Sequence, residues 1–82
     1  MPAQPVDGLM IHSARRQYTA AADKHAARIA ACTHAVRLDL AHSRPAGAAA
    51  RQLAAEVQSL LDTLASLRTV EKLAAWARQA AA

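Results

Sequence analysis

The sequence predicts an all-α fold, an antiparallel hairpin of two long helices, which we expect to dimerise into a four-helix-type bundle. Alanine is the most frequent residue of the chain, and it is the strongest helix former. The large apolar side chains recur at spacings of three and four residues, which places them along one side of a helix. After residue 8 the only proline and the only glycine lie together in the segment 43–47 (SRPAG), between two helical patterns.

The small size of the chain is the reason to expect a dimer. With 82 residues and a mass of 8.7 kDa it forms one domain at most. Hydrophobic residues make up 54% of the chain, but many of them are alanines, and Tyr18 and Trp76 are the only aromatic residues. Because few large side chains are present to fill a core, we expect self-association to cover apolar surface that one copy leaves exposed.

The cysteine content and the hydropathy pattern predict a cytoplasmic protein with no membrane span. Cys32 is the only cysteine, so no disulfide can form within the chain, which fits a reducing compartment. Residues 1–12 lack the basic start and the apolar run of a signal peptide. No segment has the roughly 18–20 consecutive apolar residues that a membrane-spanning helix needs.

The first predicted helix covers residues 9–42, at the start of a single helical domain (9–82) that follows a flexible lead-in at residues 1–8. Asp7 is the favoured N-cap, and Ser13 would cap a later start. On a helical wheel at 100° per residue, one apolar stripe runs along this segment. The predicted core and self-association positions on the stripe are Ile11, Tyr18, Ile29, Val36 and Leu40.

The segment 43–47 predicts a short turn, and a short turn between long helices makes them antiparallel neighbours. Pro45 suits the first turn of a helix, so the second helix should begin near residue 45 or 46. Ser43 or Arg44 would then lie near the N-cap, and Ser43 is chemically the better cap. A clean apolar stripe then extends to residue 67. It supplies five more predicted core and self-association positions: Leu53, Val57, Leu60, Leu64 and Leu67.

The apolar pattern changes phase after residue 67. On an ideal continuous helix, Val70, Leu73 and Trp76 project from nearly the opposite side to the leucine stripe. Either the helix breaks near residues 66–69 and a short third helix covers about 70–80, or it continues and its last turns bury a different face.

Two interpretations of the C-terminal apolar residues follow. The first makes Val70, Leu73 and Trp76, together with Leu61, candidates for binding a partner protein, because tryptophan is enriched at the centres of interfaces. The second is that the C-terminal residues close the end of the bundle against the start of the first helix.

The titratable side chains predict no enzyme, no metal site and no cofactor. The acidic residues are scattered, whereas general acid–base catalysis needs two groups that converge on a pocket. His25 and Cys32 share the apolar stripe, but they are seven residues apart, about 10 Å along a helix. That separation is too large for both to bind one metal ion, so we expect them to be packed or partly exposed side chains.

The predicted function is a small non-enzymatic protein-interaction module. It would act as a regulator or inhibitor by stoichiometric binding to an unidentified protein, and phages or other mobile elements often encode proteins of this kind. The alternative is a basic helical dimer that binds the phosphate backbone of DNA or RNA, since the net charge is +4. The arginines that would make those contacts are Arg15, Arg16, Arg28, Arg37 and Arg44.

Overall fold

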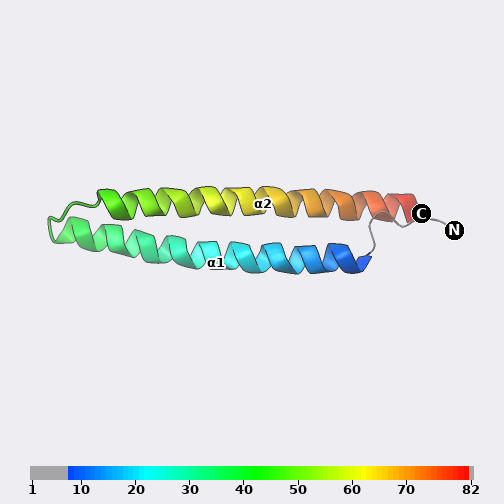
Figure 1. The fold of residues 1–82 in the computed structure, drawn as a ribbon, viewed down its shortest axis with the longest axis horizontal. Coiled ribbons are helices and arrows are strands. Elements are labelled where there is room, and N and C mark those ends of the chain that lie inside the picture. Colours follow the sequence, from blue (N-terminus) through cyan, green and yellow to red (C-terminus); the bar gives the residue numbers. More distant parts are fainter. Residues whose placement is uncertain (1–7, 82) are drawn as a thin grey trace.

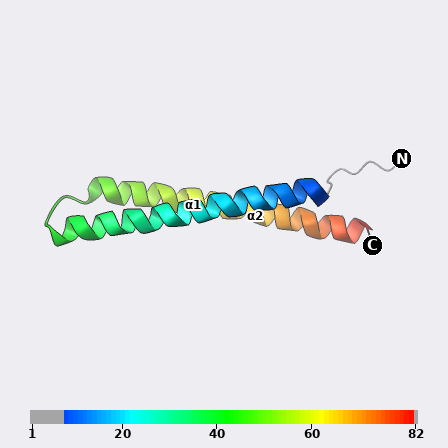
Figure 2. The same cartoon turned by 90° about the horizontal axis from the view of Figure 1, so that it is seen from below.

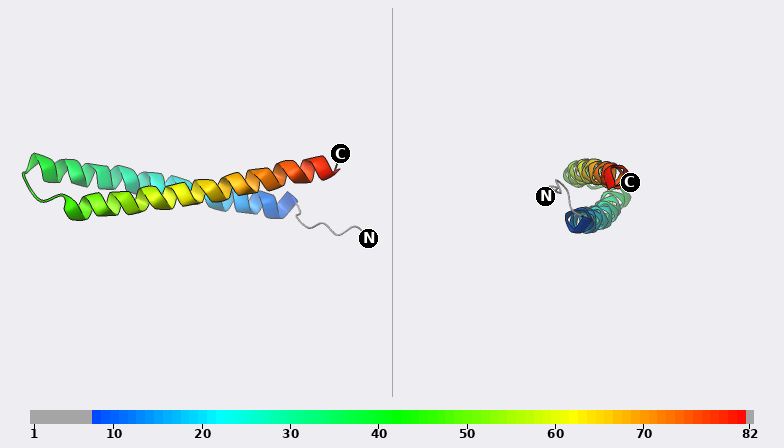
Figure 3. Two further views of the ribbon diagram at one scale, coloured as in Figure 1. Left: turned by 90° about the horizontal axis from the view of Figure 1, so that it is seen from above. Right: turned by 90° about the vertical axis from the view of Figure 1, so that its right-hand side faces the viewer.

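Two long helices form an antiparallel hairpin in the computed structural model, which describes residues 8–81 (Figure 1). Helix α1 covers Gly8–Ala41 and helix α2 covers Gly47–Ala81. The helices lie side by side along their whole length and cross at a shallow angle near the middle (Figure 2; Figure 3). At 1.5 Å per residue each helix is about 50 Å long, so the hairpin is a rod. The predicted helical hairpin is confirmed.

The second helix is unbroken. Helix α2 passes through residues 66–69 without interruption, so no third helix is present within residues 8–81. The hydroxyl of Thr69 donates to the backbone carbonyl of Ala65, as threonine does inside helices. Of the predicted lead-in, residues 1–7, with the predicted cap Asp7, lie outside the described residues, and Gly8 is already the first residue of α1.

The turn between the helices is built around Ser43. The backbone N–H of Arg44 donates to the carbonyl of Asp39 at 2.7 Å, and that of Ser43 donates to the carbonyl of Leu40 at 3.2 Å. This pair of hydrogen bonds is a Schellman motif, which ends a helix with a residue in the left-handed conformation, and Ser43 has a φ of 54°. The sequence predicts Ser43 as the N-cap of the second helix. The structure corrects this, because Ser43 terminates α1 and Ala46 directly precedes α2.

The face of α2 that packs on α1 repeats every seven residues. Its buried and half-buried positions include two rows: Leu53, Leu60, Leu67 and Ala74, and Glu56, Thr63, Val70 and Ala77. This alternation of three and four residues, sustained along the helix, is the seam of a coiled coil. Val70 therefore shares the face of the leucines, so the predicted change of phase is wrong for Val70, whereas Leu73 and Trp76 lie off this face and are exposed. Glu56 and Thr63 occupy the row of Val70 earlier in the helix, and their polarity hides the repeat when only apolar residues are followed.

Helix α1 follows the same repeat. One buried or half-buried row holds Ile11, Tyr18, His25, Cys32 and Asp39, and a second holds Arg15, Ala22, Ile29 and Val36. Leu40, a predicted core residue, lies outside both rows and is 66% exposed. An ideal wheel drifts by about 20° per heptad from the 3.5-residue repeat of a coiled coil. Over the four heptads from Ile11 this drift adds up to about 80°. An ideal wheel therefore places Leu40 on the stripe, although the residue of the packed row at this point of the helix is Asp39.

The core of the hairpin is thin and lies toward the open end, where α1 begins and α2 ends. Ile11, Val70 and Ala74 form a buried cluster there, and Cys32 is buried separately. No side chain within residues 8–81 falls below 2% exposure. Of the predicted core positions, Val57 and Leu64 are exposed, as is Leu40. The middle of the hairpin therefore leaves apolar area uncovered.

Candidate interaction surfaces

One long edge of the hairpin exposes a line of apolar residues on α2. Val57, Leu61 and Leu64 are 39%, 55% and 45% exposed. Their spacing of four and three residues places them in one line beside the leucine seam. A shallow depression on this line is lined by Leu61, Leu64, Ala65 and Arg68. Two predicted core positions and one predicted partner-binding position thus lie together on the surface.

The ion pair between Arg15 and Glu71 shows which residues of α1 lie on the same edge. The guanidinium donates to both carboxylate oxygens, at 2.5 and 3.2 Å. Glu71 lies two heptads after Val57, and Arg15 lies two heptads before Ile29. Because the helices are antiparallel, Ile29 lies opposite Val57, and the half-buried Val36 follows one heptad later. We call the following residues the apolar edge: Ile29, Val36, Val57, Leu61 and Leu64.

A second apolar surface lies near the open end, on the opposite edge. Leu73 and Trp76 are 41% and 52% exposed, and they are neighbours one turn apart on α2. Met10 of α1 is also exposed, and it borders an almost entirely apolar depression beside Leu73. We call Met10, Leu73 and Trp76 the open-end patch. The depression is lined by Met10, Ile11, Ala14, Val70 and Leu73.

Val70 is predicted to bind a partner protein, but in the structure it belongs to the core. It is buried, it packs against Ile11, and it lies among the residues that line the depression. The two interpretations of the C-terminal residues therefore apply to different side chains. Val70 closes the end of the hairpin, whereas Leu73 and Trp76 stay accessible.

Three of the five arginines predicted to contact nucleic acid pair with carboxylates. Arg16 and Arg37 pair with no carboxylate of the described residues, and they lie about 30 Å apart along α1. In the closest pair, the hydrogen bond from Arg15 lowers the pKa of the Glu71 carboxyl below its ordinary value. The pairs and their shortest N–O distances are Arg15 with Glu71 (2.5 Å), Arg28 with Glu56 (3.8 Å) and Arg44 with Asp39 (3.1 Å).

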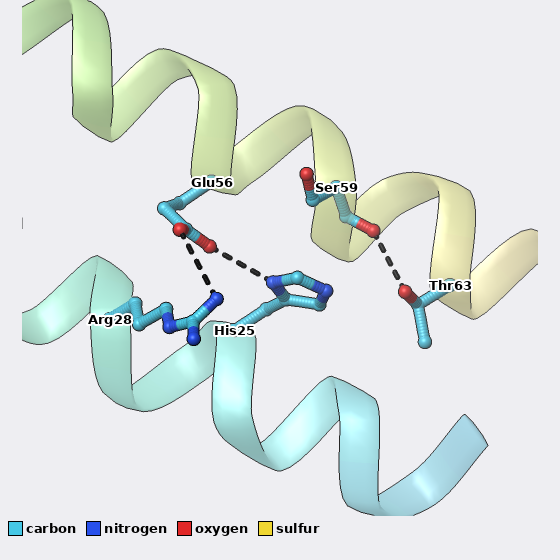
Figure 4. Close-up of polar contacts among 5 residues, drawn as sticks. All are labelled: His25, Arg28, Glu56, Ser59 and Thr63. Carbon is cyan, nitrogen blue, oxygen red and sulfur yellow. Dashed lines mark hydrogen bonds and ion pairs between the residues drawn. The ribbon is translucent and has the colours of Figure 1, made fainter. Parts of the chain in front are cut away.

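A polar cluster crosses the seam near the middle of the hairpin (Figure 4). Glu56 points from α2 toward α1, where its carboxylate lies 2.9 Å from Nδ1 of His25 and 3.8 Å from Arg28. The His25 and Glu56 side chains are only 21% and 17% exposed. A polar group in a coiled-coil seam restricts how the helices align, because a shifted alignment would leave it unpaired. The signal that could have identified Glu56 is its spacing, three residues after Leu53 and four before Leu60.

Other kinds of site find little support in the described residues. Within 8–81, no three histidine, cysteine, aspartate or glutamate side chains are grouped so that they could hold a metal ion. Cys32 is a free thiol, and it is buried. Neither described helix has an apolar stretch of the length that crossing a membrane requires. The apolar edge and the open-end patch are the candidate interaction surfaces, because both expose large apolar side chains.

Comparisons with protein families, with curated proteins and with solved structures give no match to this chain.

Proposed function

We propose that this chain is a non-enzymatic protein-interaction module that acts as a homodimer and regulates or inhibits a partner protein by stoichiometric binding. The observation that carries the proposal is the open-end patch. Tryptophan dominates many interfaces because it removes a large area from water while ordering few rotatable bonds. Here Trp76 stays half-exposed beside Leu73, in a chain with one other aromatic residue.

The depression beside Leu73 supports a partner that inserts an apolar side chain. Its lining residues include the buried Ile11 and Val70 and the exposed Met10, whose flexible side chain can adapt to different shapes. Lys72 precedes Trp76 by one helical turn, and the net charge of the chain is +4. A helix or loop with an exposed apolar residue next to acidic residues therefore fits this surface best.

The nucleic-acid alternative has weaker support. A surface that follows a phosphate backbone needs several unpaired cations in a row. Arg16 and Arg37 lack carboxylate partners among the described residues, but they are too far apart to form such a row. Binding of DNA or RNA at low salt that weakens steeply at moderate salt would favour this alternative over the proposal.

The double substitution Leu73→Ser and Trp76→Ser tests the proposed function. Wild-type protein, the double variant and the control Leu38→Ser are each used to capture proteins from an extract of the source organism. Leu38 is 40% exposed and lies far from the open-end patch, at the turn end of α1. We expect the wild type and the control to retain a protein in a fixed molar ratio, and the double variant to retain at least about ten-fold less.

Circular dichroism of the same three proteins separates binding from folding. We expect the helical signal to be the same in all of them, because Leu73 and Trp76 are exposed. Equal capture by the wild type and the double variant would contradict the proposal. A loss of helical signal in the double variant would also contradict it, because the patch would then be part of the core.

A further inference from the structure

We propose that a second copy of this chain docks on the apolar edge, with the two α2 helices antiparallel and Leu61 of each copy at the two-fold axis. This inference rests on the homodimer of the proposed function and specifies its surface, orientation and alignment. The open-end patch lies on the opposite edge, so the second copy does not cover it in this arrangement. The product is a four-helix bundle.

The alignment of the two helices explains why the apolar edge is uncovered in one copy. Ala22 lies one heptad after Arg15, and Leu64 lies one heptad before Glu71, so Ala22 faces Leu64 across the hairpin. Alanine is too small to cover a leucine, and Leu64 is 45% exposed. The row of α1 that contains Ala22 thus leaves a shallow surface, which a helix from another molecule can approach closely.

The accessible area of the chain agrees with a missing partner. A folded monomer of 8.7 kDa is expected to expose about 4,700 Å², whereas this chain exposes 6188 Å². If the eight residues outside the described part are counted as fully extended chain, the excess is still about 600 Å². A stable interface of standard size buries about 800 Å² on each partner. Part of the excess follows from the rod shape of the hairpin, and the excess is large enough to supply most of the area that such an interface needs.

The charges beside the apolar edge favour the antiparallel orientation. Arg68 lies one heptad after Leu61 and lines the depression on this edge. In a parallel pair of α2 helices, Arg68 would face Arg68 of the second copy, and like charges that face each other are destabilising. In the antiparallel pair, Arg68 faces Ala54 of the second copy, where its aliphatic stem can pack and its charge can reach water.

The antiparallel pair also matches the apolar residues with one another. With Leu61 at the axis, Val57 of one copy packs against Leu64 of the other, and the reverse contact follows from the two-fold symmetry. The depression lined by Leu61, Leu64, Ala65 and Arg68 can receive a side chain of the second copy. A self-complementary surface of this kind closes after two copies and does not continue into a filament.

Disulfide trapping tests the orientation and the alignment. Each cysteine is introduced into the full chain carrying Cys32→Ala, which removes the native thiol. Leu61→Cys should cross-link readily between copies, because residues at the axis lie within the reach of a disulfide. Arg68→Cys should not cross-link, because the two thiols would lie about 21 Å apart along antiparallel helices.

Mass measurement by light scattering tests the surface. The wild type should have twice the chain mass of 8.7 kDa at micromolar concentration. Leu61→Glu should have the mass of one chain, because it brings two carboxylates together at the axis. The control Leu38→Glu should stay dimeric, because Leu38 belongs to the heptad row of Met10, on the opposite edge.

Each outcome supports or overturns the proposal. Cross-linking of Leu61→Cys without cross-linking of Arg68→Cys supports it, even if Leu61→Glu loses its helical signal. Cross-linking of both variants would show a parallel dimer and overturn the orientation. Failure of Leu61→Cys to cross-link in a dimeric protein would overturn the surface alone. A monomeric wild type would overturn the homodimer itself, whereas capture of a partner protein through the open-end patch is measured independently.

Discussion

At the scale of single residues, the contact between Arg15 and Glu71 is the clearest link between the two helices. Both side chains are exposed, at 40% and 50%, so water and salt screen their attraction. The contact is informative about alignment, because it joins positions 56 residues apart and shows which residues of α1 lie opposite which of α2.

The substitution Glu71→Gln tests how this ion pair depends on pH. The hydrogen bond from Arg15 lowers the pKa of the Glu71 carboxyl in the folded protein below its ordinary value of 4.5. A lowered pKa in the folded state contributes stability above pH 4.5, and this contribution is lost as the pH falls through the folded-state pKa. We expect Glu71→Gln to lower the Tm slightly at pH 7 and to leave it unchanged near pH 2. Thermal unfolding followed by circular dichroism measures both.

High salt provides the control for this prediction. At neutral pH the difference in Tm between Glu71→Gln and the wild type should shrink as salt is raised, because the pair is exposed. A difference that persists both near pH 2 and at high salt would mean that Glu71 contributes by packing and not by charge.

At the scale of elements, helix α1 ends with a serine in the left-handed conformation, which is unfavourable for a residue with a Cβ. The Schellman motif requires the left-handed region at Ser43, which has a φ of 54°. Glycine is the usual residue at such a position, because a Cβ is unfavourable there. The hydrogen bonds of the turn and the contact between Arg44 and Asp39 hold Ser43 in this conformation.

The substitution Ser43→Gly should therefore stabilise the hairpin. Removing the Cβ relieves the unfavourable φ, and part of this gain is offset by the greater freedom of glycine in the unfolded chain. We expect the free energy of unfolding to rise by about 0.5–1 kcal/mol, measured by urea denaturation. Ser43→Ala is the matched control and should give no increase. A decrease for Ser43→Gly would show that the serine hydroxyl contributes to the turn.

The structure of α2 also shows where prediction from the sequence is limited. The leucines at 53, 60 and 67 predict the packed face correctly, because they lie at its centre, where the choice of wheel matters least. Val70 is misplaced because the earlier members of its row, Glu56 and Thr63, are polar and hide the repeat. Leu40 of α1 is misplaced because an ideal wheel ignores the supercoil, and that error grows along the helix. Glu56 is missed, because a carboxylate in a leucine seam contradicts the usual pattern.

At the scale of the whole molecule, a thin core and two exposed apolar surfaces make association central to the behaviour of the chain. Four hydrophobic side chains are buried within residues 8–81, and three of them lie in the cluster near the open end. Under the proposed arrangement, the apolar edge completes the core of the bundle and the open-end patch remains for a partner protein.

The proposed dimer predicts a Tm that depends on protein concentration. Because folding is coupled to association, higher concentration favours the folded dimer by mass action. A rise of about 100-fold in concentration should raise the Tm by on the order of 5–10 °C, measured by circular dichroism or calorimetry. Leu61→Glu should show no such dependence. A wild-type Tm that stays constant over the same range would contradict coupled folding and association.

The sequence by itself determined the two helices, the turn at 43–47 and the shortage of large core side chains. These features follow from helix propensity, from proline and glycine, and from apolar spacing, all of which act between residues close in the chain. Only the tertiary structure decided that Val70 is buried, that Leu40 is exposed and that Leu64 lies on an open edge. Those outcomes depend on how two supercoiled helices align, and that alignment is set by contacts between residues far apart in the chain, such as the packing of Ile11 with Val70 and the pair of His25 with Glu56.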